Sequence, residues 1–97
     1  MRFRIVLATQ ALRDLARLSA RERENVKDAI EAHLRHEPML VSQSRIKRLR
    51  GLSRPQYRLR VGEIRVFYDV KADAVEVLAI VAKAHASRWL EEEGEQP

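Results

Sequence analysis

Residues 57–70 read YRLRVGEIRVFYDV, and this stretch decides the fold. Apolar residues alternate with arginines on both sides of Gly62-Glu63, which is the period-2 pattern of half-buried β-strands. Two such runs joined by a Gly-X pair predict a β-hairpin in which Gly62 supplies the positive φ of a type II′ turn. The side chains that then face the core are Tyr57, Leu59, Val66 and Tyr68.

The predicted pairing sets arginine against arginine. A type II′ turn pairs Val61 with Ile64, so Arg60 lies directly opposite Arg65 and Arg58 lies diagonal to Arg65 on the same face. Like charges that face each other across two strands lower the stability of a sheet. We therefore expect something outside the hairpin to compensate for the repulsion.

Basic residues concentrate in one segment of the chain. The 97 residues include 19 lysines and arginines and 14 acids, for a formal net charge of +5. Residues 44–65 hold eight of the basic side chains against the single acid Glu63. Such segregation indicates a phosphate backbone or an acidic protein as partner, and the alternative is a solvated charged face. The candidate nucleic-acid-binding residues are Arg45, Lys47, Arg48, Arg50 and Arg54.

The composition excludes several classes of site. The chain has no cysteine, so disulfides and thiolate metal sites are absent. His33, His36 and His85 lack acidic neighbours at a ligand spacing, so we expect no metal and no other cofactor. The sequence shows neither a signal peptide nor an apolar run of membrane-spanning length, which predicts a cytoplasmic protein without membrane contacts. We expect one domain over residues 1–97, with a frayed acidic tail at residues 91–97.

A strand and two helices are predicted before the hairpin. Residues 2–7 alternate as a strand does, and Thr9 is the expected N-cap of the short amphipathic helix that follows. Ser19 and Glu22 have the spacing of a capping box, which starts a second helix that ends before Pro38. The helical spacing also predicts which side chains face the core. In the first helix these are Ala8, Ala11, Leu12, Leu15 and Ala16, and in the second they are Val26, Ala29, Ile30 and His33 or Leu34.

The remaining elements complete an α+β fold. Residues 74–82 read AVEVLAIVA, which is apolar at all but one position and predicts a strand in the middle of a sheet. Residues 87–97 predict a short C-terminal helix anchored by Trp89, and residues 46–51 contain a short extended piece. The order β-α-α-β-β-β-α predicts a helical hairpin on one side of a largely antiparallel sheet of about four strands, with the last helix near its edge.

The motifs KRLRGL, YRLRVGEIRVFYDV and VEVLAIVAK, in this order after a strand and a helical hairpin, resemble the RelE/ParE superfamily of bacterial toxin–antitoxin toxins. The resemblance covers residues 2–90, and the short helical hairpin is more similar to the RelE branch than to the ParE branch. It implies a fold similar to that of small microbial ribonucleases and a cognate antitoxin that wraps the toxin. RelE-type members cut mRNA in the ribosomal A site without a metal, whereas ParE-type members poison DNA gyrase.

The resemblance also implies site residues. The RelE-type active site consists of basic residues on the two hairpin strands, joined by an arginine and a tyrosine near the C-terminus. Ala84 and Leu90 stand at those last two positions, so nearby side chains are the candidate substitutes. The candidate catalytic residues are therefore Arg58, Arg60, Arg65, Lys83 and His85.

The chemistry of RNA cleavage fits part of this set. Attack by a 2′-hydroxyl builds negative charge on a phosphorane-like transition state, which fixed guanidinium groups stabilise. Arginine is a poor general base, and His85 is the only candidate of a residue type that titrates near neutrality. Cleavage of mRNA at the ribosome is the leading hypothesis. Inhibition of a target such as DNA gyrase by binding alone, and RNA binding without toxicity, remain open. We expect the free toxin to be a monomer.

Overall fold

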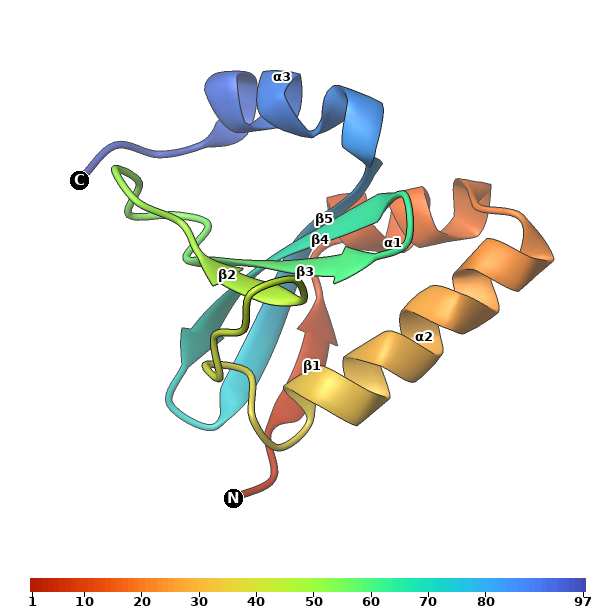
Figure 1. Cartoon of the computed structure of the whole chain (residues 1–97), viewed down its shortest axis with the longest axis horizontal. Coiled ribbons are helices and arrows are strands. Elements are labelled where there is room, and N and C mark those ends of the chain that lie inside the picture. Colours follow the sequence, from red (N-terminus) through yellow and green to blue (C-terminus); the bar gives the residue numbers. More distant parts are fainter.

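The computed structural model describes residues 1–97 as three helices and five strands in one sheet (Figure 1). In the sheet order β1-β5-β4-β3-β2, β1 runs parallel to β5 and all other neighbours are antiparallel. The predicted α+β class is confirmed, and the fifth strand is the short extended piece, β2. In chain order the elements are β1 Arg4–Leu7, α1 Thr9–Arg17, α2 Ala20–Leu34, β2 Ile46–Arg48, β3 Tyr57–Val61, β4 Ile64–Lys71, β5 Ala74–Ala82 and α3 Lys83–Glu93.

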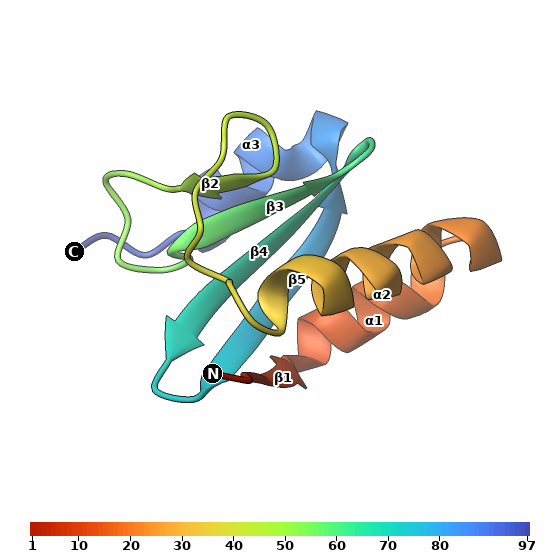
Figure 2. The same ribbon diagram turned by 60° about the horizontal axis from the view of Figure 1, so that its bottom comes forward.

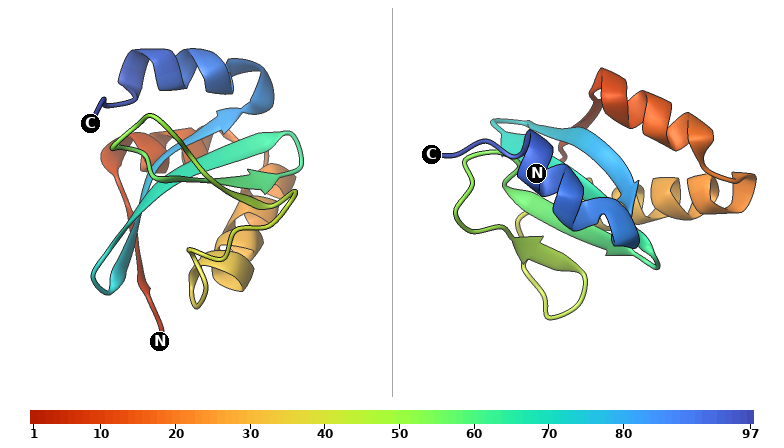
Figure 3. Two further views of the ribbon diagram at one scale, coloured as in Figure 1. Left: turned by 60° about the vertical axis from the view of Figure 1, so that its left-hand side comes forward. Right: turned by 90° about the horizontal axis from the view of Figure 1, so that it is seen from above.

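Helices cover both faces of the sheet. Figure 2 shows α1 and α2 on one side and α3 on the other, and the right-hand view of Figure 3 shows α3 lying across the sheet. The sequence placed α3 near an edge, but its contacts are with the interior strands β4 and β5. The reason is the anchor residue: Trp89 stacks on Phe67 of β4, with ring centroids 5.0 Å apart. None of the three helices combines the length and the apolarity that a membrane crossing needs.

The main core lies between the sheet and the helical hairpin. Val26, Ile30 and Leu34 on α2 are buried, as are Ala11 and Leu15 on α1, in agreement with the predicted inward faces. They pack against the core side of the sheet. Leu12 and Ala16 were also predicted to point inward, but both are exposed, Leu12 by 54%. The buried side chains of the sheet in this cluster are Ile46, Leu59, Ile64, Val66, Tyr68, Val75, Val77 and Ile80.

The two helices begin differently. The capping box of α2 is confirmed: the Glu22 N–H donates to Ser19 Oγ at 3.1 Å, and the Ser19 N–H donates to Glu22 Oε1 at 3.2 Å. The predicted Thr9 cap is wrong. Ala8 is the N-cap residue of α1 and Thr9 is already helical, so no side chain caps this helix.

The hairpin register agrees with the prediction in every pair. Val61 pairs with Ile64, and Arg60 pairs with Arg65. Gly62 has a φ of +58°, while Glu63 is not among the residues with positive φ, as a type II′ turn requires. The turn between β4 and β5 has no glycine, and there Ala72 takes a φ of 50°.

This strained alanine gives a stability prediction. An L-residue in the left-handed region costs roughly 1 kcal/mol relative to glycine, so Ala72→Gly should raise the free energy of unfolding by about that amount. For a domain of this size the melting temperature should rise by about 4–8 °C. The control is Ala74→Gly, in strand β5 without positive φ, which should lower the melting temperature. A melting temperature for Ala72→Gly at or below that of the wild type would contradict the strain argument.

Candidate functional site

Basic side chains from three strands and the start of α3 gather on the sheet face opposite the core. Lys47 on β2 lies opposite Arg58 on β3, and Arg60 lies opposite Arg65 on β4. Lys83 begins α3, and its N–H donates to the Glu63 carbonyl oxygen at 2.8 Å, which fixes it beside the hairpin turn. We call the following five residues the basic face: Lys47, Arg58, Arg60, Arg65 and Lys83.

A cavity of about 280 Å³ lies between the basic face and α3. Lys47, Arg58, Arg65 and Lys83 line it together with one hydroxyl group, that of Ser87. No acidic side chain lines it. The apolar part of the wall consists of Leu49, Phe67, Ala86 and Leu90. A cavity with several cations and an apolar wall is suited to an anionic group on a partly apolar ligand.

No carboxylate neutralises the basic face. The five salt bridges of the structure involve none of its residues. Asp69 and Glu76, the acids of the same sheet face, pair with Arg54, and Glu76 also pairs with Lys71. No carboxylate of the chain therefore compensates for the repulsion predicted from the register.

Arg58 shows the consequence most directly. Its side chain is partly buried in the cavity wall, and its Nε has no hydrogen-bond partner. Burial, followed by the charges of Arg65 and Arg60, lowers the pKa of the Arg58 guanidinium. A bound anion would relieve both the missing hydrogen bond and the repulsion.

Arg65 and Arg60 differ although they face each other. Arg65 is only 8% exposed, and its Nη1 donates to the carbonyl oxygens of Gly62 at 2.8 Å and Ile64 at 3.1 Å. It therefore braces the hairpin turn in addition to adding charge. The guanidinium of Arg60 is exposed and makes no hydrogen bond within the chain, so it is free for a ligand.

Lys83 and His85, the two candidate catalytic residues on α3, have different surroundings. Lys83 lines the cavity, whereas His85 is exposed and is not part of the cavity wall. The cavity therefore contains no side chain of a type that ordinarily titrates near neutrality. No three histidine or carboxylate side chains come together as metal ligands would.

The predicted nucleic-acid-binding residues have divided roles. Lys47 belongs to the basic face, and Arg45 lines a smaller cavity of about 160 Å³ together with Arg60. Arg48 lies over the Tyr57 ring, with its Cζ 5.1 Å from the ring centroid. The remaining two are Arg50, which is exposed in the loop after β2, and Arg54, which is held by carboxylates.

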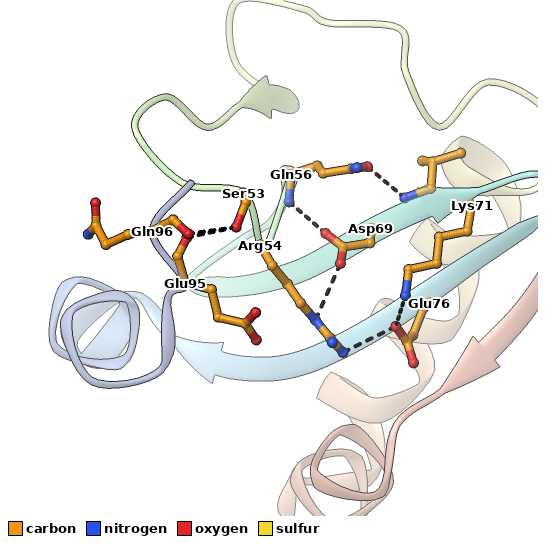
Figure 4. Close-up of polar contacts among 9 residues, drawn as sticks. Ser53, Arg54, Gln56, Asp69, Lys71, Glu76, Glu95 and Gln96 are labelled. Atoms are coloured by element: carbon orange, nitrogen blue, oxygen red, sulfur yellow. Dashed lines mark hydrogen bonds and ion pairs between the residues drawn. The ribbon is translucent and has the colours of Figure 1, made fainter.

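Arg54 belongs to a polar network at the opposite end of the same sheet face (Figure 4). Its Nε lies 3.4 Å from Asp69 Oδ2, and its Nη2 lies 3.2 Å from Glu76 Oε1. Asp69 is 2% exposed and accepts the Gln56 N–H at 2.8 Å. Burial raises the pKa of the Asp69 carboxyl, while the Gln56 hydrogen bond and the Arg54 charge lower it. These contacts give Arg54 a structural role and take it out of the candidate surface.

The network continues into the C-terminal segment. Glu95 pairs with Arg54 in an isolated antiparallel bridge, and the Ser53 N–H donates to the Glu95 carbonyl oxygen at 2.8 Å. Ser53 Oγ also donates to the Gln96 carbonyl oxygen (Figure 4). These contacts hold residues 95–96, which lie in the segment predicted as a frayed tail, against the loop before β3.

Comparison with known protein families identifies the family of this chain. Residues 5–88 match the family model of the ParE toxin of type II toxin–antitoxin systems, so the chain belongs to this toxin family. The prediction of a RelE/ParE superfamily toxin is thereby confirmed. No curated protein sequence matches the chain.

Solved structures show the same fold. The toxin–antitoxin complex RelBE2 of Mycobacterium tuberculosis is similar at 25% identity and a TM-score of 0.69, with 84% of this chain and 99% of that chain covered. The RelB–RelE complex of Methanococcus jannaschii is similar at 21% identity and a TM-score of 0.67, covering 87% and 96%. A free mutant of Escherichia coli RelE is similar at 21% identity and a TM-score of 0.56, covering 95% and 94%.

The burial of Arg65 predicts a structural effect. Like-charge repulsion alone would make Arg65→Ala stabilising. We expect the reverse, a loss of about 1–3 kcal/mol in the free energy of unfolding, because two hairpin carbonyl oxygens lose a buried donor. Arg60→Ala, the matched control on the opposing strand, should change stability by less than about 0.5 kcal/mol. Equal melting temperatures for the two variants would contradict the bracing role.

Replacement of an arginine by methionine should have opposite effects on stability at the two ends of this sheet face. Arg58→Met keeps the apolar stem and removes an unneutralised charge, so it should stabilise the protein by about 0.5–1 kcal/mol. Arg54→Met leaves Asp69 buried without its cation and should destabilise by about 1–3 kcal/mol. Urea unfolding at low and at 1 M salt provides the measurement, and the gain from Arg58→Met should shrink at high salt. Destabilisation by Arg58→Met would contradict the uncompensated repulsion.

Proposed function

We propose that the protein is a growth-inhibiting toxin that acts by binding an anionic target surface with its basic face, without cleaving RNA. The observation that carries this proposal is the composition of the cavity wall, which contains four cations but neither a carboxylate nor a histidine. The protein would act as a monomer in the cytoplasm once its antitoxin is removed.

The electrostatics of the basic face favour anion binding. Its cations have no carboxylate partner, and Arg58 has already lost part of its hydration in the folded protein. A ligand therefore does not need to break an existing ion pair, and the desolvation of Arg58 is already part of the folded state. A charge-assisted hydrogen bond to such a group is about twice as strong as a neutral one.

Cleavage would require a group that moves protons. A 2′-hydroxyl must lose a proton before it attacks, and the leaving oxygen must gain one. Arginine stays protonated at any physiological pH, so it cannot accept the hydroxyl proton, and it is a very weak acid for donating one to the leaving oxygen. His85 lies outside the cavity, and Ala84 and Leu90 stand where the family resemblance implies an arginine and a tyrosine. The resemblance to ParE toxins then points to DNA gyrase as the target.

Cleavage of mRNA at the ribosome is the second candidate. The four cations around one cavity suit a transition state with extra negative charge, and Lys47 or Lys83 would have to act as the base. The likeness in fold to solved RelE toxins also supports this candidate.

Induced expression in a heterologous host separates these candidates. We expect growth arrest with DNA breaks and induction of the DNA-damage response, and no new 5′ ends in mRNA by primer extension. Arg58→Met should abolish the arrest, whereas Arg13→Met, an exposed arginine on α1, should leave it unchanged. Cleavage of translated mRNA soon after induction would overturn the proposal that the toxin acts by binding alone, and it would support the second candidate. The absence of any growth defect would contradict both.

A further inference from the structure

The side chain of Arg58 indicates which kind of group the cavity between the basic face and α3 accepts. Its Nε is buried without a hydrogen-bond partner, and the residue lines the cavity. A buried donor without an acceptor destabilises a folded protein, so each such case calls for a specific explanation. An anionic acceptor in the cavity would satisfy this donor and also offset the charges of Arg65 and Arg60 that act on it.

The charges around the cavity favour a dianion over a monoanion. Four cationic side chains line it without an acid, and one of them, Arg65, is held in place by carbonyl oxygens of the hairpin. A phosphate monoester carries about −1.5 to −2 charges at pH 7 and presents three strong acceptor oxygens. A carboxylate or an internal phosphodiester carries a single charge and presents only two free oxygens. Of these groups, the phosphate monoester matches the cavity best.

The apolar part of the wall indicates that the phosphate bears an organic group. Ala86 and Leu90 on α3, together with Leu49 and Phe67, form this part of the wall. Inorganic phosphate would use only the cations, whereas an attached ring can also remove apolar surface from water. A nucleoside provides such a ring, because every nucleobase has an apolar face.

The size and the borders of the cavity limit the ligand to one nucleotide unit. Its volume of about 280 Å³ lies below the roughly 300–1,000 Å³ that is typical of ligand pockets. The covering helix α3 is held at both ends, by the Lys83 N–H on the Glu63 carbonyl oxygen and by residues 95–96 on Ser53. Figure 3 shows the helix lying across the sheet face. An internal phosphodiester carries a nucleoside on each side, and this volume accommodates only one of them.

We propose that the cavity binds a terminal phosphate, that is, a phosphate monoester attached to one nucleoside. The phosphate accepts a hydrogen bond from Arg58 Nε and is neutralised by the other cations of the wall, while the nucleoside packs against Leu90 and its apolar neighbours. The same chemistry occurs in a free nucleotide and at the phosphorylated end of a nucleic-acid strand. The inference rests on the proposed function in that both use the basic face. A free nucleotide would compete with the target, whereas a strand end would be part of the target.

Calorimetry on the purified full-length chain tests the combination of phosphate and nucleoside. The probes are adenosine 5′-monophosphate, inorganic phosphate and adenosine, all at one salt concentration. We expect the nucleotide to bind at least about tenfold more tightly than either of the others, because it alone engages both the cations and the apolar wall. An affinity for the nucleotide equal to that for adenosine or for inorganic phosphate would overturn the proposal.

Two variants test the role of the buried guanidinium. Arg58→Met should weaken binding of the nucleotide by at least about tenfold, because a charge-assisted hydrogen bond is lost. Arg13→Met, the matched control on α1, should bind within about twofold of the wild type, because this arginine is exposed and remote from the cavity. Melting temperatures show that both variants are folded. Unchanged affinity in Arg58→Met would overturn the proposal.

A DNA dinucleotide with and without a terminal phosphate separates a terminal from an internal phosphate. The phosphorylated form should bind at least about tenfold more tightly, because only this form offers a dianion. Equal affinities would overturn the proposal, since the internal phosphodiester would then be sufficient. If adenosine 5′-monophosphate binds as tightly as the phosphorylated dinucleotide, the result supports a site for free nucleotides. If the dinucleotide binds more tightly, the result supports a site for strand ends.

Growth arrest provides a separate readout for the proposed function. A wild-type chain that binds the nucleotide but does not arrest growth would contradict the proposed function and leave this inference intact. A chain that arrests growth but binds neither the nucleotide nor the phosphorylated dinucleotide would overturn this inference alone.

Discussion

The stacking of Trp89 on Phe67 determines which part of the sheet remains open. Phe67 lies on the central strand β4 and points away from the main core, yet it is fully buried. It is buried because α3 crosses this face and presents Trp89 at a centroid distance of 5.0 Å and an interplanar angle of 10°. Stacking contributes about 0.5–1.5 kcal/mol beyond the area that the rings bury. With α3 fixed over Phe67, a cavity remains between the helix and the cations near the hairpin turn, and Arg60 stays exposed.

The same face is electrostatically neutral at one end and unbalanced at the other. At the neutral end, the carboxylates of Asp69 and Glu76 hold Arg54, and hydrogen bonds tie the C-terminal segment to the loop before β3 (Figure 4). At the other end, five cations share one surface with no carboxylate partner. A fold keeps such local repulsion only when contacts elsewhere stabilise it sufficiently, and functional sites are where this arrangement is usual. The contrast within one face makes the basic end a candidate site, since the chain has acids and uses them at the other end.

Patterns that are local in the sequence predicted most of the fold. The Gly-X turn fixed the hairpin register down to the Arg60–Arg65 pair, and the Ser19–Glu22 spacing fixed the start of α2. The apolar run at residues 74–82 predicted the interior strand β5 within its observed limits. Each of these signals depends on residues that are neighbours along one element, so periodicity and turn chemistry are sufficient to identify them.

Features that depend on distant residues were not predictable. β1 pairs only with the first half of β5, and beyond that half the Ile80 N–H donates to the Asp14 carboxylate at 2.9 Å. No local pattern in the sequence connects two residues that are 66 positions apart. The sequence likewise does not distinguish the basic residues from one another, although Arg54 is neutralised by carboxylates and Arg65 braces a turn. Their roles depend on which carboxylate or carbonyl oxygen lies within reach, and only tertiary structure decides that.

An unbalanced basic face also links the two proposed partners. A ligand that binds only the folded protein stabilises it in proportion to the logarithm of its concentration relative to Kd. Relief of the repulsion at Arg60 adds to the affinity of any anionic partner, so the antitoxin and the target gain from the same cations. Both cannot occupy Arg60 at once. Competition between an antitoxin and the target for the basic face would therefore neutralise the toxin without a conformational change.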